Sequence, residues 1–503
     1  MKIPIIDLLV FLIFMTGIVL FGCSFFFKNR SSVQFTSGGG ALPAWAVGMS
    51  IFATFVSSIS FLALPGKAYQ SDWNAFVFSL SIPIAAYMAV KFFVPLYRSI
   101  NSISAYTYLE IRFGAWARIY ASLCYILTQI MRMGTILYLL ALPLNALFGW
   151  NIGLTIVATG ICVILFSMMG GIKAVIWTDA VQGIILIGGA LTCALFLLFS
   201  MPESPRQMFQ IAAAHHKFSL GSLSTSISES TFWVVLIYGL FINLQNYGID
   251  QNYVQRYMTT KTDTQAKRSA LFGSLLYIPV SLVFFFIGTA LFAYYKAQPD
   301  LLPLHLQEYA AADKVFPYFM VNGLPAGLTG LLIASVFAAG MSTISTSVNS
   351  SATIIYTDYF KRYTKNKSSE HSSMNVLYIS SALAGIAGIG VALAMIKVQS
   401  ALDAWWALAS IFSGGMLGLF LLGYFARKVQ KIYAAIGVAT GILVIFWLSL
   451  SPIWFNHGNW LKFRSPFHAN LTIVIGTIVI FLTGFMLAGI RFLNPDKKQY
   501  KSL

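Results

Sequence analysis

Apolar stretches long enough to cross a lipid bilayer follow one another along most of this 503-residue chain. A helix needs roughly 20 mainly apolar residues to cross about 30 Å of hydrocarbon. The stretches cover residues 5–27, 42–64, 73–97, 119–148, 152–169, 174–199, 232–247, 271–294, 328–356, 376–396, 404–425, 433–450 and 469–490. Hydrocarbon does not tolerate unpaired backbone groups, so these thirteen stretches predict an all-α polytopic membrane protein.

The charged residues fit this prediction and suggest an orientation. Only 9% of the residues are charged, against roughly 25% in soluble domains. With the N-terminus outside, most Lys and Arg residues fall in cytoplasmic segments, Arg256 among them, which predicts a cytoplasmic C-terminus. The net charge of +17 is spread thinly over short loops, which argues against a nucleic-acid partner. We expect residues 1–503 to form one transmembrane domain.

The second and seventh stretches are poor continuous helices. Hydroxyl side chains cluster over residues 54–60, and Asn243, Gln245 and Asn246 precede Gly248. Transporters built from inverted repeats place their midplane sites at such interrupted segments, and the two lie five spans apart. The alternative is that these polar side chains only form hydrogen bonds between helices.

The ninth stretch carries a row of small and hydroxyl-bearing residues within two turns. Ala339, Ser342, Thr343 and Thr346 share one helix face, and Ser345 lies between them. Converging hydroxyl oxygens suit a sodium ion. A face of small residues that only packs against a neighbouring helix remains the alternative.

Asp179 lies inside the cytoplasmic end of the sixth stretch, at a depth where an ionised carboxylate needs a cation. A sodium ion between Asp179 and the serine face would satisfy both. The alternative is an interfacial residue that reaches water or Lys173.

Arg132 lies near the middle of the stretch 119–148. A guanidinium at that depth costs between about 3 and more than 10 kcal/mol unless a partner offsets it. Asp179 is too close to the cytoplasmic end of its own helix, and we expect no other acid at the depth of Arg132. Three partners remain open: a substrate carboxylate held by the guanidinium fork, backbone carbonyls where the second stretch is broken, or the outer surface.

Three segments together resemble the sodium:solute symporter family. They are residues 38–45 (GGGALPAW) leading into 52–54 (FAT), residues 170–182 (GGIKAVIWTDAVQ) and the serine face at 339–349. Residues 57–60 (SSIS) and 67–73 (KAYQSDW) are similar to the bacterial sodium/sialic acid branch. The resemblance implies a LeuT-type inverted five-plus-five repeat, with 42–199 and 232–425 as its halves, 5–27 as a leading helix and 433–490 as two trailing ones.

The resemblance also implies roles for individual residues. A first sodium would bind backbone carbonyls of Ala53, Val56 and Ala339 and the hydroxyls of Ser342 and Thr343. A second sodium would lie near Asp179, Ser342, Ser345 and Thr346. The substrate would lie against Ser57, Ser58 and Ser60, with its carboxylate on Arg132. Phe55 and Ser79 depart from the branch, which can place threonine and glutamine there, so contacts to the sugar hydroxyls or the N-acyl group differ.

We therefore expect a sodium-coupled symporter, and no enzyme, that imports a carboxylated sugar by alternating access, with sialic acid (N-acetylneuraminate) as the first candidate. The chain has no phosphate-binding loop for direct ATP drive. We expect a monomer in the lipid of a bacterial cytoplasmic membrane. Alternatives are a symporter of another organic anion, a neutral sugar or an amino acid such as proline, with Arg132 then structural, or a receptor or channel on this scaffold.

Overall fold

The computed structural model describes residues 4–26, 31–307, 312–364, 369–396, 415–455 and 458–493, and every regular element in these ranges is helical. Ten of the described helices are long and apolar enough to cross a membrane, or eleven if the bent pair Ser32–Gly40 and Ala44–Phe55 counts as one span. The protein is therefore a multi-pass membrane protein. The long helices are α1 (Ile5–Cys23), α9 (Ala115–Phe148), α10 (Ile152–Phe199), α12 (Phe232–Ile249), α14 (Asp263–Ala297), α16 (Leu328–Ile354), α18 (Glu370–Met395), α21 (Lys431–Trp454) and α22 (Leu471–Leu493).

Shorter helices complete the bundle. Residues 74–100, the predicted third span, form a chain of short helical segments that includes α5 (Val77–Leu80), α6 (Ile82–Met88) and α7 (Val94–Ile100). Of the predicted span 404–425, only α20 (Met416–Phe425) lies within the described residues. Among the remaining short helices are α2 (Ser32–Ser37), α8 (Thr107–Phe113), α11 (Pro205–Ala214), α15 (Ala312–Asn322) and α17 (Lys361–Tyr363).

Helix α10 bends where the sequence separates the fifth and sixth stretches. Its 48 residues would extend about 72 Å as one straight helix, more than twice the hydrocarbon thickness. Gly171 interrupts it with φ 55° and ψ −156°. This backbone conformation is essentially restricted to glycine, so this position requires Gly171.

The predicted second span is broken, as its hydroxyl-rich sequence indicates. Helix α3 (Ala44–Phe55) ends at Val56, whose backbone is extended, and α4 (Ser58–Gln70) begins after Ser57. The Ser57 side chain accepts a hydrogen bond from the backbone N–H of Ser60, which caps the new helix. The last carbonyls of α3 therefore have no donors from a following helical turn.

The predicted seventh span is interrupted in a similar way. Helix α12 ends at Ile249, one residue beyond Gly248, and α13 (Gln251–Tyr257) begins after the extended residue Asp250. The Asp250 side chain accepts a hydrogen bond from the backbone N–H of Asn252 at 2.8 Å. Both interruptions predicted from the sequence are thus confirmed.

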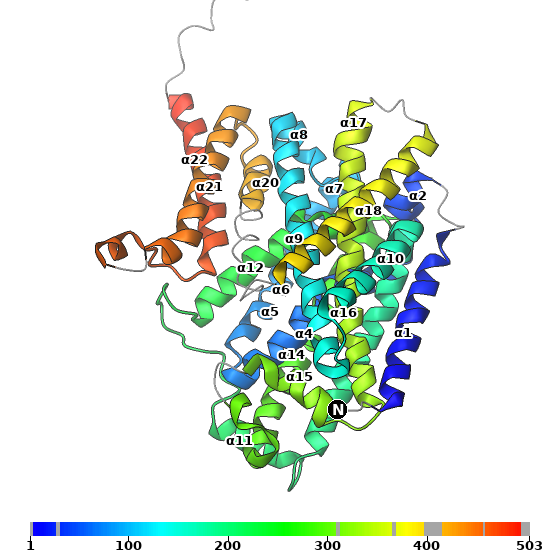
Figure 1. Ribbon diagram of the computed structural model, residues 1–503. Coiled ribbons are helices and arrows are strands. Elements are labelled where there is room, and N and C mark those ends of the chain that lie inside the picture. The colour runs from blue at the N-terminus through cyan, green and yellow to red at the C-terminus, as the bar shows by residue number, and fades with distance from the viewer. Residues whose placement is uncertain are drawn as a thin grey trace, which may run out of the picture.

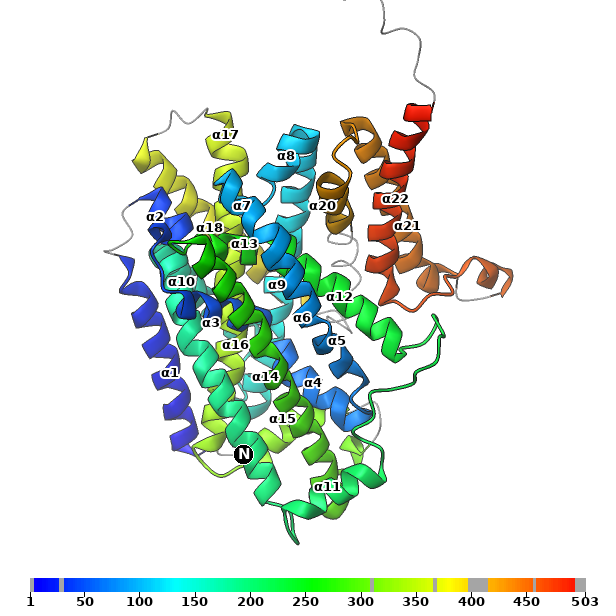
Figure 2. The ribbon, with the colours of Figure 1, turned by 180° about the vertical axis from the view of Figure 1, so that it is seen from behind.

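Helix α16 lies at the centre of the bundle, and almost all of its residues are buried. It packs against α1, α9, α10 and α18, while α14 packs against α3 and α4 (Figure 1). The α21 and α22 pair forms one edge of the molecule and α1 the opposite edge (Figure 2). The start of α1 lies at the same end as α11 and α15, whereas α22 ends at the opposite end (Figure 1).

Hydrogen bonds join the leading helix α1 to the start of α16. Asp7 on α1 is 1% exposed. Its Oδ1 accepts hydrogen bonds from the backbone N–H groups of Gly327 and Gly330, both at 2.7 Å. A Cβ atom on Gly330 would lie 2.6 Å from the Asp7 carbonyl oxygen. Glycine at position 330 therefore permits the close approach that caps α16.

Candidate functional site

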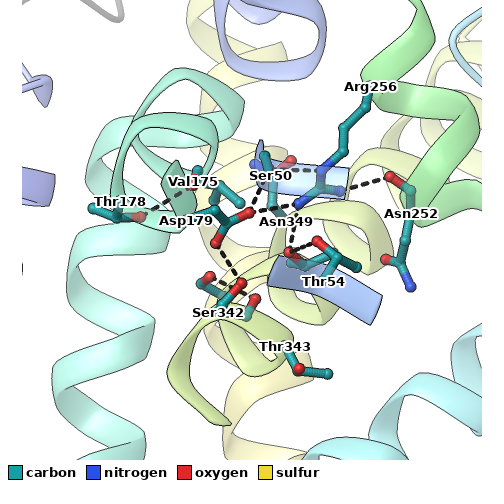
Figure 3. Close-up of polar contacts among 12 residues, drawn as sticks. Ser50, Thr54, Val175, Thr178, Asp179, Asn252, Arg256, Ser342, Thr343 and Asn349 are labelled. Atoms are coloured by element: carbon teal, nitrogen blue, oxygen red, sulfur yellow. Dashed lines mark hydrogen bonds and ion pairs between the residues drawn. The ribbon is translucent and has the colours of Figure 1, made fainter. Parts of the chain in front are cut away.

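An ion pair between Asp179 and Arg256 lies in the interior of the bundle (Figure 3). The Asp179 side chain on α10 is 0% exposed and that of Arg256 on α13 is 1% exposed, and Nη2 of the arginine lies 2.8 Å from Oδ2 of the carboxylate. Ser342 on α16 donates to Oδ1 at 2.8 Å. Ser50 on α3 donates to Oδ2. Both carboxylate oxygens thus have hydrogen-bond donors.

Arg256 connects three other segments to this carboxylate. Its Nε donates to Oγ of Ser50 at 2.7 Å, and its Nη1 donates to the carbonyl oxygen of Asn252 at 2.6 Å. Its Nη2 also donates to Oγ1 of Thr346 on α16 at 2.7 Å. A buried guanidinium is tolerated when its donors and its charge are compensated, and here Asp179 and the three oxygen acceptors do so.

The prediction that Arg256 lies in a cytoplasmic segment is wrong, because α13, which follows the break at Asp250, is buried in the protein core. The seven residues of α13 are all buried. They are too few and too polar to show an apolar stretch. The signal available in the sequence was the i, i+4 repeat of Asn252 with Arg256 and of Gln251 with Gln255, which aligns polar groups along α13.

The structure brings together the residues predicted for a second sodium. Arg256, which was not among the predicted residues, contacts two of them. Asp179 and Ser342 share a hydrogen bond, and Thr346 contacts the same guanidinium nitrogen as Asp179. Ser345 lies on the same helix, but its hydroxyl donates back to the Ser342 carbonyl at 3.0 Å.

The residues predicted for the first sodium come from the end of α3 and from α16, which pack against each other. Thr54, beside Ala53, lies within hydrogen-bond distance of Thr346, with 3.3 Å between their hydroxyl oxygens. Thr343 donates to the Ala339 carbonyl at 3.1 Å. The broken end of α3 therefore faces the serine side of α16. The residues predicted for this ion, all buried, are Ala53, Val56, Ala339, Ser342 and Thr343.

The guanidinium of Arg132 on α9 has little hydrogen bonding to compensate its charge. Among the described residues its one hydrogen bond runs from Nη2 to the carbonyl oxygen of Thr54, at 3.4 Å, longer than the usual 2.9–3.0 Å. The structure thus places the guanidinium beside the carbonyls of the broken second span, one of the three partners left open by the sequence. Its capacity for a bidentate partner remains unused.

The expectation that no second acid lies near Arg132 is wrong. Asp250, at the break between α12 and α13, lies within electrostatic range of the Arg132 guanidinium. No ion pair within 4 Å joins Arg132 to an acid in the part of the chain that the structure describes. Asp250 was not expected near Arg132, because in the sequence it follows the seventh apolar stretch.

The serines predicted to contact substrate differ in their surroundings. The Ser57 hydroxyl caps α4, and the Ser79 hydroxyl lies 2.9 Å from that of Ser281 on α14. Ser58 is 0% exposed, and its hydroxyl has no hydrogen-bond partner among the described residues. Buried polar groups are normally paired, so Ser58 is the serine whose hydroxyl is free to contact a bound molecule.

Phe55, also predicted in the substrate site, belongs to an aromatic cluster at the end of α3. Its ring stacks on Tyr247, with 5.3 Å between centroids, and meets Tyr277 edge-on at 4.5 Å. Tyr253 lies at 6.5 Å. This side of the predicted site is therefore lined by aromatic rings.

The site offers hydroxyls, one carboxylate and helix-end carbonyls as oxygen ligands, which suit a hard cation. No three His, Cys, Asp or Glu side chains gather anywhere in the described ranges as transition-metal ligands do. The chemistry available is thus the binding of a hard cation and an organic anion.

The chain has close relatives of known type. The sodium/sialic acid symporter SiaT of Proteus mirabilis is 34% identical over 86% of this chain and 87% of its own length. The sodium/sialic acid symporter NanT of Aliivibrio fischeri is 32% identical over 96% and 93%. A solved structure of a Na⁺-coupled sialic acid symporter, substrate-bound and outward-open, matches with a TM-score of 0.88 at 31% identity, over 96% of this chain and 98% of that one.

The fold is also shared with more distant transporters. Mhp1, a nucleobase-cation-symport-1 family transporter, matches with a TM-score of 0.57 at 15% identity over 93% of this chain and 96% of its own. The model of the sodium:solute symporter family matches residues 35–441. With this match and relatives above 30% identity over most of its length, the chain belongs to the sodium:solute symporter family and is a membrane transporter, not an enzyme.

Proposed function

We propose that this protein is a symporter that uses the sodium gradient to import a carboxylated sugar, sialic acid first, across the bacterial cytoplasmic membrane. The observation that carries the proposal is Arg132, a guanidinium inside the bundle whose one hydrogen bond among the described residues is 3.4 Å long. A substrate carboxylate supplies the missing bidentate partner. The sialic acid symporters to which the chain is similar support the choice of substrate.

The serines at the start of α4 and the aromatic cluster around Phe55 line the rest of the substrate site. Ser57, Ser58 and Ser60 lie at the start of α4, and the unpaired hydroxyl of Ser58 is available to a substrate oxygen. The Ser79 hydroxyl is within hydrogen-bond distance of the Ser281 hydroxyl, and Phe55 contributes an aromatic ring to the site. The site therefore recognises the acid headgroup through polar contacts and the remainder of the molecule largely through aromatic faces.

Sodium binds in two places in this proposal. The first ion uses carbonyls of Ala53, Val56 and Ala339 with the hydroxyls of Ser342 and Thr343. The second uses Asp179, Ser342, Ser345 and Thr346. The packing of the α3 end against α16, and the Asp179 to Ser342 hydrogen bond, support these sets.

The helices form thirteen spans in this proposal, with the N-terminus outside and the C-terminus in the cytoplasm. The bend at Gly171 divides α10 into two spans, and the interrupted spans correspond in two inverted five-helix halves, 42–199 and 232–425. One leading helix (5–27) and two trailing helices (433–490) flank them. The α1 start and the α22 end lie at opposite ends of the molecule, which supports termini on opposite sides of the membrane (Figure 1). The distribution of Lys and Arg along the sequence supports the choice of the cytoplasmic side.

Ion and substrate cooperate through the break between α3 and α4. Sodium bound to the carbonyls of the break fixes the segment that carries Ser57 and Ser58, next to Arg132. Thermodynamic linkage requires that sodium and substrate raise each other's affinity by the same factor. A membrane potential of 100 mV contributes about 2.3 kcal/mol for each charge carried inward.

Uptake into proteoliposomes tests the proposal. With an inward sodium gradient we expect uptake of N-acetylneuraminate that saturates and that disappears when potassium replaces sodium. Its methyl ester, a neutral hexose and proline serve as matched solutes without the free sugar carboxylate. Preferred uptake of proline or the hexose would overturn the proposal, and sodium conductance without substrate at rates beyond a carrier would indicate a channel.

A second candidate is a sodium symporter for another organic anion. The ring of Phe55, together with the Ser79 to Ser281 contact, removes hydrogen-bonding groups from the site. An anion that is smaller or more apolar than a nine-carbon sugar acid fits such a surface. Aliphatic and aromatic monocarboxylates therefore belong in the same uptake panel, where uptake preferred over N-acetylneuraminate would favour this candidate.

A further inference from the structure

We propose that Arg256 is a tethered cation that competes with the second sodium ion for Asp179, so that sodium binding is coupled to the position of α13. This inference rests on the second sodium site of the proposed function. It concerns a residue that the ligand set of that site does not include.

The geometry around one nitrogen atom suggests the competition. Nη2 of Arg256 lies 2.8 Å from Oδ2 of Asp179 and 2.7 Å from Oγ1 of Thr346, two of the four side chains proposed for the ion. An ion bound to both oxygens must occupy nearly the same place. Figure 3 shows the guanidinium reaching from α13 toward Ser50 and Asp179.

The charges lead to the same conclusion. Asp179 is the one acid that forms an ion pair with Arg256 among the described residues, and both side chains are almost completely excluded from water. Sodium added to the intact pair would place two positive charges on the single carboxylate of Asp179, which is costly, because Asp250, the other buried acid within electrostatic range of Arg256, is shared with Arg132. When sodium enters, Nη2 therefore leaves Asp179 and Thr346.

The other contacts of Arg256 give this displacement a mechanical consequence. Its Nη1 is held by the carbonyl oxygen of Asn252 on α13. The Asn252 side chain accepts a hydrogen bond from Tyr125 on α9 at 2.7 Å. Tyr125 lies seven residues before Arg132 on the same helix, hence on the same face. A shift of α13 is thus transmitted from the ion site to the helix that carries the proposed substrate arginine.

Sodium-dependent thermal stabilisation of the purified full-length protein, without substrate, tests the inference. In Arg256→Gln the competing charge is absent, so we expect a lower melting temperature in potassium, a larger upward shift with sodium, and a half-saturating sodium concentration at least about fivefold lower than in the wild type. A half-saturating concentration that is unchanged or higher would overturn the inference.

Two further variants keep the test decisive. Asp179→Asn added to Arg256→Gln should abolish the gain in sodium affinity, which shows that the ion binds at Asp179; a gain that persists would contradict the inference. Ser50→Ala removes the Nε contact and also one hydrogen bond to Asp179, so it loosens Arg256 while the charge of the arginine remains. Ser50→Ala should lower the half-saturating sodium concentration less than Arg256→Gln does. It replaces Arg256→Gln in the test if that variant does not fold. A rise in the half-saturating sodium concentration would indicate that Arg256 has a purely structural role.

Arg362→Gln is the matched control, because Arg362 on α17 also pairs with an acid, Glu110, and both side chains are partly exposed. It should leave the half-saturating sodium concentration unchanged; a fall equal to that of Arg256→Gln would overturn the inference. The readout needs no sialic acid. A failed uptake experiment therefore leaves this inference standing, whereas stabilisation that shows no sodium dependence in wild type or variant would overturn it.

Discussion

Two arginines inside this transporter, Arg132 and Arg256, have opposite surroundings. Arg256 is 0% exposed, pairs with Asp179 at 2.8 Å and donates to three further oxygens. Arg132 is partly buried and, within the part of the chain that the structure describes, has one hydrogen bond at 3.4 Å. Both guanidiniums are withdrawn from water, Arg256 completely and Arg132 in part. The comparison teaches that an unsatisfied guanidinium can bind an anion from outside the protein, whereas a satisfied one has to leave its partner before that partner can bind a cation.

The largest expected effect concerns the satisfied arginine. Asp179→Asn should lower the free energy of unfolding by about 3–5 kcal/mol, because Arg256 then retains an uncompensated buried charge. Denaturation in detergent without sodium measures the loss. Asp263→Asn is the matched control: Asp263 contacts Arg98 at 2.7 Å but is 62% exposed, so its removal should cost less than about 1 kcal/mol. Equal losses would remove the distinction between the two kinds of pair.

The unsatisfied arginine should show the reverse pattern. Arg132→Gln should weaken substrate binding roughly 10- to 150-fold, the equivalent of about 1.5–3 kcal/mol for hydrogen bonds to a charged group. Its melting temperature without substrate should fall less than that of Asp179→Asn, since it loses one long hydrogen bond to Thr54 and the attraction to Asp250 but no ion pair within 4 Å among the described residues. Substrate-dependent thermal stabilisation measures both quantities. Arg132→Lys keeps the charge without the fork, and sialate uptake retained in Arg132→Gln would contradict the carboxylate role.

Lys217 offers a third cation that, unlike arginine, can give up its charge. It lies in the segment between α10 and α12, is 5% exposed and donates to the carbonyls of Tyr69 and Ser71 at 2.7 Å. Burial lowers the pKa of Lys217 from 10.5 to about 8, and Asp72 partly opposes this shift. Between these two values the unfolded chain binds more protons, so the free energy of unfolding rises with pH.

The wild type should therefore gain stability relative to Lys217→Met as the pH rises from about 8 to 10. Thermal unfolding of both proteins at several pH values measures the difference. Lys217→Arg, which stays charged throughout, should gain nothing in this window. A constant difference between wild type and Lys217→Met would show that this charge is not destabilised by burial.

The smallest expected effect belongs to Ser58. Because its hydroxyl has no partner among the described residues, Ser58→Ala should change the free energy of unfolding by less than about 0.5 kcal/mol. Substrate affinity should fall roughly two- to tenfold, the effect of one neutral hydrogen bond. Ser335→Ala, at a buried serine that bonds to Leu331 and Ile185, should leave affinity unchanged. Unaltered affinity in Ser58→Ala would exclude Ser58 from the substrate site.

The sequence predicted those features that depend on local chemistry. Clustered hydroxyls predicted the break at Ser57, and the burial cost of a carboxylate predicted that Asp179 lies near the serine face. The surroundings of Arg256 and Asp250 could not be predicted in this way, because hydropathy averages over a window and α13 has only seven residues. Whether such a short polar segment lies in water or in the core depends on the helices that close around it.

The contact between Asp7 and the start of α16 has a consequence for biosynthesis. The two partners of the Asp7 to Gly330 hydrogen bond are 323 residues apart in sequence. At ribosomal rates of 5–20 residues per second, roughly 16 to 65 s separate their synthesis. During that interval the carboxylate of Asp7, in the first turn of α1, lacks the backbone N–H donors of Gly327 and Gly330. The leading helix can therefore take its final position only after the start of α16 has been made.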